Sequence, residues 1–404
     1  MNAQPVAFQD RVEAMDVLRG FALWGVFSVN MLFFSAPFYT TMMRPWPETA
    51  HPAWHAALLF LMQGKFYGLF SFLFGMGFAE QSQRLEARGE PATHIHRLRL
   101  AWLLVFGLAH GLLVWMGDIL FMYALLGFVL MAFRNRTPRT LLIWAFALLG
   151  SLMLVYLVGF GLLSWAQGQP EAAASLVKAS AKQAMGIARA TQESLSVYGS
   201  GDYVALFRLR ARELLTNYGM TLSVVPQILA MFLLGAWVSR RRVFREPGTH
   251  VPLLRRAAWA GLAAGLTGNA FTLWATQGGM PGPTHSLPLL GMAVSMVANP
   301  ALTLGYAACL VLALEKGRLP WLRSLAWSGR MALTNYLMHS LVFTTVFYSF
   351  GLGLFGKVGL PWCLAMAAGL WLFQIPLSRA WLSRHRMGPA EHLWRKLTYG
   401  RIEA

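Results

Sequence analysis

Long apolar runs separated by short polar segments dominate the pattern of this 404-residue chain. A helix that crosses a membrane needs roughly 20 apolar residues, and runs of about this length recur along the whole chain. The predicted helices cover residues 17–38, 54–80, 98–115, 117–133, 139–166, 219–238, 256–276, 287–314, 329–350 and 358–380. The pattern therefore predicts an all-α protein, a polytopic membrane helix bundle of about ten transmembrane helices.

The positions of Lys and Arg predict how this bundle is oriented. If the predicted helices alternate in direction, most Lys and Arg residues fall in the polar segments of one side. Such an excess marks the cytoplasmic side of a membrane protein. We therefore expect cytoplasmic N and C termini, a cytoplasmic tail at 381–404, and a multi-pass protein of the bacterial inner membrane.

One long segment, 167–218, lies outside the predicted membrane helices, on the extracytoplasmic side. It is rich in helix-forming residues, and Tyr203, Phe207, Leu214 and Tyr218 recur at helical spacing. Two interpretations remain open, an amphipathic helix on the membrane surface and a solvated helical hairpin that packs on the bundle. No repeat or linker divides the chain, so we expect residues 1–404 to form a single transmembrane domain with this helical insertion.

The composition supports a membrane protein and argues against several other classes. Apolar residues make up 56% of the chain and charged residues 12%, whereas about a quarter of a soluble protein is charged. The net charge of +18 is spread between apolar runs, so nucleic acid is not an expected partner, whereas anionic lipid headgroups or a phosphorylated cofactor are. The two cysteines lie in apolar runs, and no metal site is predicted.

Polar residues inside the apolar runs are costly in lipid and are therefore candidates for function. His110 lies in the third predicted helix and Asp118 opens the fourth. A break at Gly117 would bring both to one outer pocket, where the carboxylate would orient an imidazole suited to general-base catalysis. The alternatives are that His110 only forms a hydrogen bond between helices and that Asp118 only caps the fourth helix.

Lys65 is the most anomalous residue, because a lysine at mid-depth costs roughly 2.5–3.5 kcal/mol. The simplest partner is Asp118 or another carboxylate near the outer leaflet. An ion pair that joins two helices, phosphate binding and catalysis all remain open. Asn30 in the first helix and Asn335 in the ninth are further candidates, and Arg330 is either a ligand or an interfacial anchor.

Several stretches resemble the YeiB-like family of bacterial membrane proteins. The match covers nearly the whole chain and is carried by DVLRGFALWGVFSVN (16–30), KFYGLFSFLFGMGF (65–78), HGLLVWMGDILFMYALLG (110–127), GRMALTNYLMHS (329–340) and GPAEHLWRKLTYGR (388–401). This resemblance implies the membrane helix bundle more directly than it implies an activity.

The first helix is also similar to the start of the heparan-α-glucosaminide acetyltransferases, in which Asp16, Arg19, Gly20 and Asn30 match at equal spacing. Those membrane enzymes use cytosolic acetyl-CoA to acetylate a sugar amine across the bilayer. HPAW at 51–54 resembles the segment that holds their catalytic histidine, which makes His51 a second candidate base. The spacing from Asn30 to His51 is longer in this chain than in those enzymes, so His110 is the preferred candidate for the base.

These observations favour a membrane acyltransferase. We expect acyl-CoA as co-substrate, with its phosphates near a set of basic and amide side chains: Arg19, Arg97, Arg99, Arg330 and Asn335. His110 would act as the base and Asp118 would orient it, while Asn30 or Lys65 would stabilise the oxyanion. The expected partners are membrane lipids and an extracytoplasmic glycan, amine or lipid acceptor, and a homodimer is compatible with the sequence.

Two other classes remain open. A proton-coupled transporter or exporter would use the same Lys, His and Asp as a proton relay or substrate site. A non-catalytic lipid-binding protein would pair its polar groups with one another and leave no cavity.

Overall fold

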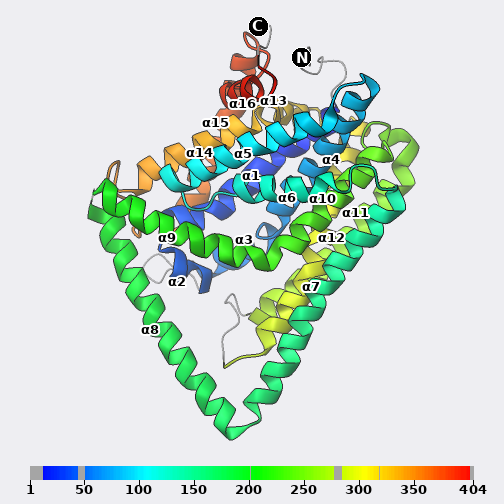
Figure 1. The fold of residues 1–404 in the computed structure, drawn as a ribbon. Helices are drawn as coiled ribbons and strands as arrows, with labels where there is room; N and C mark the ends of the chain where they lie inside the picture. Colours follow the sequence, from blue (N-terminus) through cyan, green and yellow to red (C-terminus); the bar gives the residue numbers. More distant parts are fainter. Residues whose placement is uncertain (1–11, 44–50, 201, 277–283, 318, 401–404) are drawn as a thin grey trace.

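The protein is built from helices, and the computed structural model describes residues 12–43, 51–200, 202–276, 284–317 and 319–400 (Figure 1). The longer helices are α1 (Glu13–Ser35), α4 (Lys65–Ala87), α5 (Ala92–Leu113), α7 (Pro138–Gln167), α8 (Pro170–Ser200), α9 (Tyr203–Thr221), α10 (Val225–Arg240), α11 (Val251–Thr276), α12 (Leu287–Glu315), α14 (Ala332–Phe347) and α15 (Leu360–Leu382). The shorter ones are α2 (Phe38–Met43), α3 (Pro52–Leu61), α6 (Leu120–Met131), α13 (Leu325–Arg330), α16 (Pro389–Tyr399) and the 3₁₀ helices η3 (Leu222–Val224), η4 (Pro247–His250) and η5 (Pro320–Ser324). No β-strand is present in these ranges, so the all-α prediction is confirmed.

Six stretches within the described residues are long and apolar enough to cross a membrane. They are Glu13–Ser35, Pro52–Ala87, Pro138–Gln167, Tyr203–Arg240, Leu287–Glu315 and Leu360–Leu382. Large apolar side chains lie on the outer surface of these stretches, and Val155, Trp165 and Trp362 are 64%, 68% and 72% exposed. Such side chains are stable in contact with lipid rather than water, which identifies a membrane protein.

The second predicted helix, 54–80, is in fact two helices. The break lies at Met62–Gly64, between α3 and α4. Gly64 has a φ of +86°, which is accessible to glycine but costly for other residues. A Cβ at this position would also lie 2.4 Å from the side-chain nitrogen of Asn299 on α12. The prediction was wrong here because hydropathy averaged along an apolar run does not report a backbone turn, although the break contains the polar Gln63.

Helices α5 and α6 form a tight antiparallel hairpin. A Cβ on Gly107 of α5 would lie only 2.2 Å from the backbone nitrogen of Phe121 on α6. At the open end, Arg134 after α6 donates to the Thr93 hydroxyl at the start of α5 over 2.6 Å. The 12 residues of α6 extend about 18 Å, less than the ~30 Å hydrocarbon core. The connection between the helices is buried, since Trp115, Met116 and Asp118 are 1%, 2% and 2% exposed.

Helix α1 is the central element of the half of the bundle that holds the cavity described below. It packs against α4, α13, α14 and α15. Two glycines allow α1 and α13 to touch through their backbones, since a Cβ on Gly20 would lie 2.1 Å from the Leu325 carbonyl oxygen and one on Gly329 1.8 Å from that of Asp16. The first turn of α1 and helix α16 lie on the same side of the molecule, at the top of Figure 1.

The predicted extramembrane segment contains α8 and α9. In Figure 1, α7 and α8 diverge from a common tip as the two arms of a V, and α9 crosses between the upper part of α8 and the bundle. Most of α8 is exposed, whereas α9 packs on α5 and buries Leu214, Arg210 and Glu213. Glu213 accepts hydrogen bonds from Ser194 and Tyr198 of α8 over 3.0 and 2.6 Å. Helix α9 is therefore part of the packed structure.

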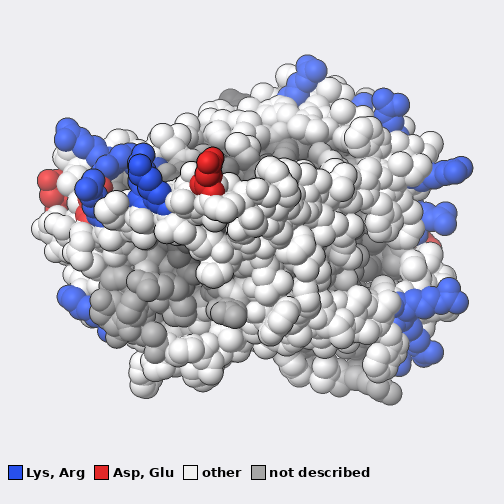
Figure 2. All heavy atoms as spheres, turned by 90° about the horizontal axis from the view of Figure 1, so that it is seen from below, with Lys and Arg blue, Asp and Glu red and all other residues white. Residues whose placement is uncertain are grey.

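Charged side chains are distributed unevenly over the surface. Figure 2 shows the face seen from below in Figure 1, opposite α16, and this face is mostly without charge. Most Lys, Arg, Asp and Glu side chains visible on it lie towards its edges, and a few lie further in on the left side of the view.

Candidate functional site

The turn between α5 and α6 brings His110 and Asp118 together. Helix α5 ends at Leu113, and the His110 carbonyl oxygen accepts hydrogen bonds from the backbone nitrogens of Val114 and Trp115. The chain then reverses direction before α6. The prediction that a break near Gly117 brings the two side chains to one place is therefore confirmed in its geometry.

His110 and Asp118 form a buried pair. His110 Nδ1 lies 2.8 Å from Asp118 Oδ2, and the two side chains are 2% and 0% exposed. The other carboxylate oxygen accepts a hydrogen bond from the backbone nitrogen of Phe121 over 2.9 Å, so Asp118 also caps α6. His110 Nε2 has no hydrogen-bond partner among the described residues. With Asp118 accepting from Nδ1–H, this nitrogen carries the lone pair of a base.

Helix α9 holds the turn from the other side. Arg210 is buried and donates to the carbonyl oxygens of Leu112 and Leu113 over 3.2 and 2.6 Å. These carbonyls end α5 and have no partner within the helix, so the cation stabilises the helix C-terminus. Asn217 donates to the Met116 carbonyl oxygen over 3.2 Å. The backbone around the His110–Asp118 pair is thus fixed by contacts from a distant segment.

A large cavity of about 1080 Å³ opens beside this pair. It is lined by residues of α1, α4, α5, α6, α14 and α16 and of the α15–α16 connection. The mouth of the cavity is rich in arginine, namely Arg19, Arg84, Arg88, Arg99, Arg330, Arg384, Arg386 and Arg395. The inner wall is mainly apolar and includes Val26, Val29, Met62, Phe66, Phe70, Phe74, Ile119 and Leu120.

The cavity runs along α1 from charged to apolar surroundings. Arg19 lies at its mouth and Asn30 lines it further along the same helix. Eleven residues separate them, which corresponds to about 16 Å along the helix. The cavity is therefore long enough to hold a flexible chain with an anionic group at one end.

Three residues that line the cavity lie beside the buried pair. Gly117, Ile119 and Tyr336 line the cavity, and all three lie next to His110 or Asp118 in sequence or in space. The centres of the Tyr336 and His110 rings are 5.2 Å apart. His110 and Asp118 do not themselves line the cavity, and the Tyr336 ring forms part of the wall beside His110.

Four of the predicted site residues line the cavity: Asn30, Arg19, Arg99 and Arg330. Arg19 pairs with Asp16 over 2.8 Å. The Arg330 guanidinium lies 5.3 Å from the centre of the Trp327 ring. Arg97 is exposed on α5 and does not line the cavity.

Lys65 is buried but does not line the cavity. Its ammonium donates to the Leu59 carbonyl oxygen over 2.8 Å, at the C-terminus of α3, where the helix dipole favours a positive charge. The expected pairing with Asp118 was wrong, because Asp118 is bound to His110 and the break at Gly64 directs Lys65 back to α3.

His51 and Asn335 also lie outside the cavity lining. His51 is exposed at the start of α3, and its ring lies close to Gly359 before α15. The buried Asn335 amide donates to the Ser328 carbonyl oxygen and the Ser378 hydroxyl, both over 3.1 Å. Its contacts therefore join α13, α14 and α15.

Sequence reasoning missed several residues that line the cavity. Tyr336 follows the candidate Asn335 directly, but an aromatic residue in an apolar run gives no sign of its own that it lines a cavity. Arg384, Arg386 and Trp394 belong to the predicted cytoplasmic tail at 381–404, to which no site residue was assigned. The run of basic residues after the last predicted helix was the available signal, but the fold had to bring it over α5.

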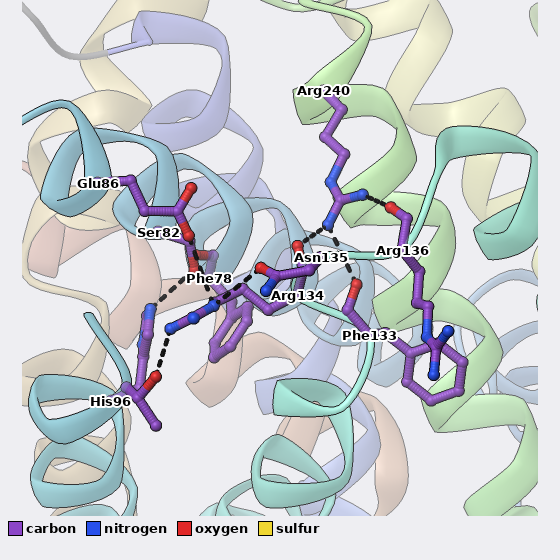
Figure 3. A network of polar contacts seen from close by, with 10 residues as sticks. Phe78, Ser82, Glu86, His96, Phe133, Arg134, Asn135, Arg136 and Arg240 are labelled. Atoms are coloured by element: carbon purple, nitrogen blue, oxygen red, sulfur yellow. Dashed lines mark hydrogen bonds and ion pairs between the residues drawn. The ribbon is translucent and has the colours of Figure 1, made fainter. Parts of the chain in front are cut away.

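A second polar network lies at the C-terminal end of α6, the end opposite Asp118 (Figure 3). Arg240 of α10 donates to the carbonyl oxygens at the end of α6, which are those of Phe133, Arg134 and Arg136. Arg134 lies 3.5 Å from Glu86 of α4, and His96 of α5 forms a 2.8 Å hydrogen bond with Ser82. These bonds join α4, α5, α6 and α10, and they support one side of the cavity mouth. The described residues contain no group of three potential metal ligands.

Comparison with other proteins places this chain among bacterial sequences of similar length. Residues 238–401 match a family described as Protein of unknown function (DUF418). The uncharacterized protein YxaH of Bacillus subtilis is 36% identical over 98% of this chain and 96% of its own length. The uncharacterized protein YeiB of Escherichia coli is 30% identical over 96% of both chains. No solved structure is similar enough to count as a match.

Proposed function

This chain belongs to the YeiB-like family, which carries the DUF418 region, and we propose from the geometry of its cavity that it is an integral membrane acyltransferase. The acyl group comes from a cytosolic acyl-CoA, and the acceptor is a hydroxyl or amine of an extracytoplasmic glycan or lipid. The observation that carries this proposal is a cavity that extends from an arginine-rich mouth to the wall of a buried His–Asp pair.

The proposed topology has about ten membrane helices, with both termini and the cavity mouth in the cytoplasm of a bacterial inner membrane. The arginines of the mouth support this orientation. The α5–α6 hairpin begins and ends on the same side, so the topology of the remaining helices does not depend on how far α6 crosses the bilayer.

The donor lies along the cavity. Its phosphates bind at the mouth, where arginines form bidentate, charge-assisted hydrogen bonds with phosphate oxygens. Its flexible arm follows α1 past the apolar wall towards Asn30. The thioester then lies next to Tyr336 and Ile119, on the cavity side of the buried pair.

The reaction is an acyl transfer by general-base catalysis. His110 Nε2 takes the proton from the acceptor O–H or N–H, and Asp118 holds the imidazole through Nδ1 and stabilises its charged form. The acceptor atom forms a bond to the thioester carbon. When the tetrahedral intermediate collapses, the carbon–sulfur bond breaks, and His110 returns the proton to the CoA thiolate.

Tyr336 has a position that this chemistry requires. Because its ring forms the wall, the acceptor reaches Nε2 when the Tyr336 side chain rotates away from His110. The phenol then lies beside the thioester carbonyl, where its O–H and the Asn30 amide donate to the developing oxyanion.

The proposal is tested with the purified full-length protein and a radiolabelled acyl-CoA. Transfer to a membrane lipid or glycan extract is expected for the wild type. The variant His110→Ala loses the general base, and its transfer rate is expected to fall by roughly 10²–10⁴-fold. His94→Ala is the matched control, because His94 is exposed on α5 and does not line the cavity.

Unchanged transfer in His110→Ala would remove His110 as the base. Wild-type protein that neither binds nor consumes acyl-CoA would overturn the proposed function. Proton-coupled flux of a small molecule into liposomes by such a protein would identify a transporter instead.

A further inference from the structure

Apart from Arg395 at the cavity mouth, the C-terminal sequence GPAEHLWRKLTYGR, at 388–401, has no role in the chemistry described above. Its described part contains α16, which begins directly after Gly388. A Cβ on Gly388 would lie 2.3 Å from a Glu391 carboxylate oxygen and 2.6 Å from the Thr334 hydroxyl, so the chain meets α14 closely at this point. The helix therefore has a defined position on the bundle.

Hydrogen bonds from three other helices hold α16. Glu391 accepts from the backbone nitrogens of Leu333 and Thr334, at the start of α14, over 2.8 and 3.2 Å. Further along, the Trp394 indole donates to a backbone carbonyl oxygen of α5, and the Tyr399 hydroxyl accepts from a glutamine of α4. All three helices contribute to the cavity lining, so α16 lies across the rim of the mouth.

Trp394 presents an aromatic surface together with a positive charge at this rim. Its indole nitrogen donates to the Arg99 carbonyl oxygen over 2.9 Å, and the Arg99 guanidinium lies 4.4 Å from the ring centre. Both residues line the cavity, and both are half-buried, so part of each remains accessible. Flat aromatic and guanidinium groups of this kind stack on nucleobases.

The positive charge near Trp394 is large enough to bind more than one phosphate group. Arginines outnumber the acidic residues in the cavity lining, and those nearest in sequence to α16 or within it are Arg384, Arg386 and Arg395. A terminal phosphate monoester carries about −1.5 to −2 charges at pH 7. A donor with a diphosphate and a separate phosphate on its nucleoside would use this excess, whereas a donor with one phosphodiester would not.

We propose that α16 and Arg99 form a recognition site for the 3′-phosphoadenosine end of coenzyme A. Trp394 stacks on the adenine, and the arginines of the tail bind the 3′-phosphate and the diphosphate. The donor is therefore a soluble CoA thioester. A thioester on a carrier protein lacks the 3′-phosphoadenosine group that this site binds. This inference rests on the proposed function, because it concerns the same cavity.

The experiment measures binding of CoA, 3′-dephospho-CoA and 4′-phosphopantetheine to the full-length protein in lipid nanodiscs. Wild-type protein is expected to bind CoA most tightly and phosphopantetheine most weakly. Trp394→Ala is expected to weaken CoA binding by roughly tenfold or more, since base–aromatic stacking contributes on this scale. The same variant is expected to leave phosphopantetheine binding unchanged.

Two further variants separate recognition from folding. Trp394→Phe retains an aromatic ring and is expected to keep most of the CoA affinity, although it lacks the bond to Arg99. Trp259→Ala removes an exposed tryptophan of α11 outside the cavity and is expected to change nothing. Thermal unfolding of each variant shows that the protein remains folded.

Equal affinity of the wild type for CoA and phosphopantetheine would overturn this inference and leave the proposed acyl transfer intact. A loss of affinity for both CoA and phosphopantetheine in Trp394→Ala would also overturn this inference. If the wild type binds none of the three probes, the proposed function fails, and this inference fails with it.

Discussion

At the scale of single residues, Tyr336 decides whether the buried His110–Asp118 pair can take part in chemistry. The pair has a geometry suited to a general base, since Asp118 occupies Nδ1 and leaves Nε2 available. Neither side chain lines the cavity, although their neighbours Gly117, Ile119 and Tyr336 do, and the Tyr336 ring centre lies 5.2 Å from that of His110. The position of this one ring therefore connects, or separates, a reactive group and a substrate-sized space.

The first residue-scale prediction concerns the Tyr336 hydroxyl. Tyr336→Phe keeps the wall and removes the proposed oxyanion donor, so kcat is expected to fall by roughly 10²–10³-fold with little change in the KM for acyl-CoA. Steady-state transfer kinetics measure both constants. Tyr306→Phe is the matched control, because Tyr306 lies outside the cavity lining and donates to the Leu61 carbonyl oxygen. A kcat for Tyr336→Phe equal to that of the control would show that the hydroxyl has no catalytic role.

At the scale of elements, two breaks in otherwise apolar helices place the polar groups. The break between α3 and α4 directs Lys65 to the C-terminus of α3, and the break between α5 and α6 joins His110 to Asp118. Each predicted apolar run overlaps a helix in the structure, because hydropathy is a property of residues that are close in sequence. The break at Met62–Gly64 was not predicted, since it depends on the φ of Gly64 and its contact with α12.

The contact between α16 and α14 leads to an element-scale prediction. The Glu391 carboxylate accepts hydrogen bonds from the first turn of α14, so Glu391→Ala is expected to cost about 0.5–2 kcal/mol of stability. Glu391→Gln keeps an oxygen acceptor and is expected to cost less. Thermal unfolding of the two variants, in the same detergent, measures the difference. Equal losses in both variants would show that the capping bonds do not account for the contribution of Glu391.

The same residue is expected to make stability depend on pH. Burial raises the pKa of Glu391 above its ordinary value of 4.5, so the folded protein binds this proton more tightly than the unfolded chain does. The stability from this proton is present at low pH and is lost as pH rises through the folded pKa. Wild-type protein is therefore expected to lose stability relative to Glu391→Gln as pH rises above 4.5, and a constant difference would contradict this.

At the scale of the whole molecule, arginine-rich polar segments gather on one side and a mostly uncharged face lies opposite α16 (Figure 2). This asymmetry is the basis of the proposed orientation, in which the cavity opens to the cytoplasm. In the proposed function, the anionic donor binds on the arginine-rich side and its acyl group lies within the membrane.

The orientation predicts which surface positions are accessible from each side. In a background with both native cysteines, Cys309 and Cys363, replaced by serine, Asn135→Cys is expected to resist a membrane-impermeant maleimide in intact spheroplasts. Gln183→Cys on α8 is expected to react, because both positions are exposed but lie on opposite sides in the proposed topology. Labelling after membrane disruption provides the control, since both cysteines should then react. The reverse labelling pattern in intact spheroplasts would show that the topology is opposite to the proposed one, with the cavity mouth outside the cell.

The sequence by itself determined that the chain is helical and apolar enough for a membrane, and that His110 and Asp118 flank a break. These properties follow from neighbours along the chain, through hydropathy, spacing and the conformational preferences of short segments. Only the tertiary structure decided that Asn335 joins α13, α14 and α15, that the Tyr336 ring lies beside His110, and that Trp394 lies on Arg99. The last two residues are 295 positions apart, and their contact exists because the packing of whole helices brings the tail across the cavity mouth.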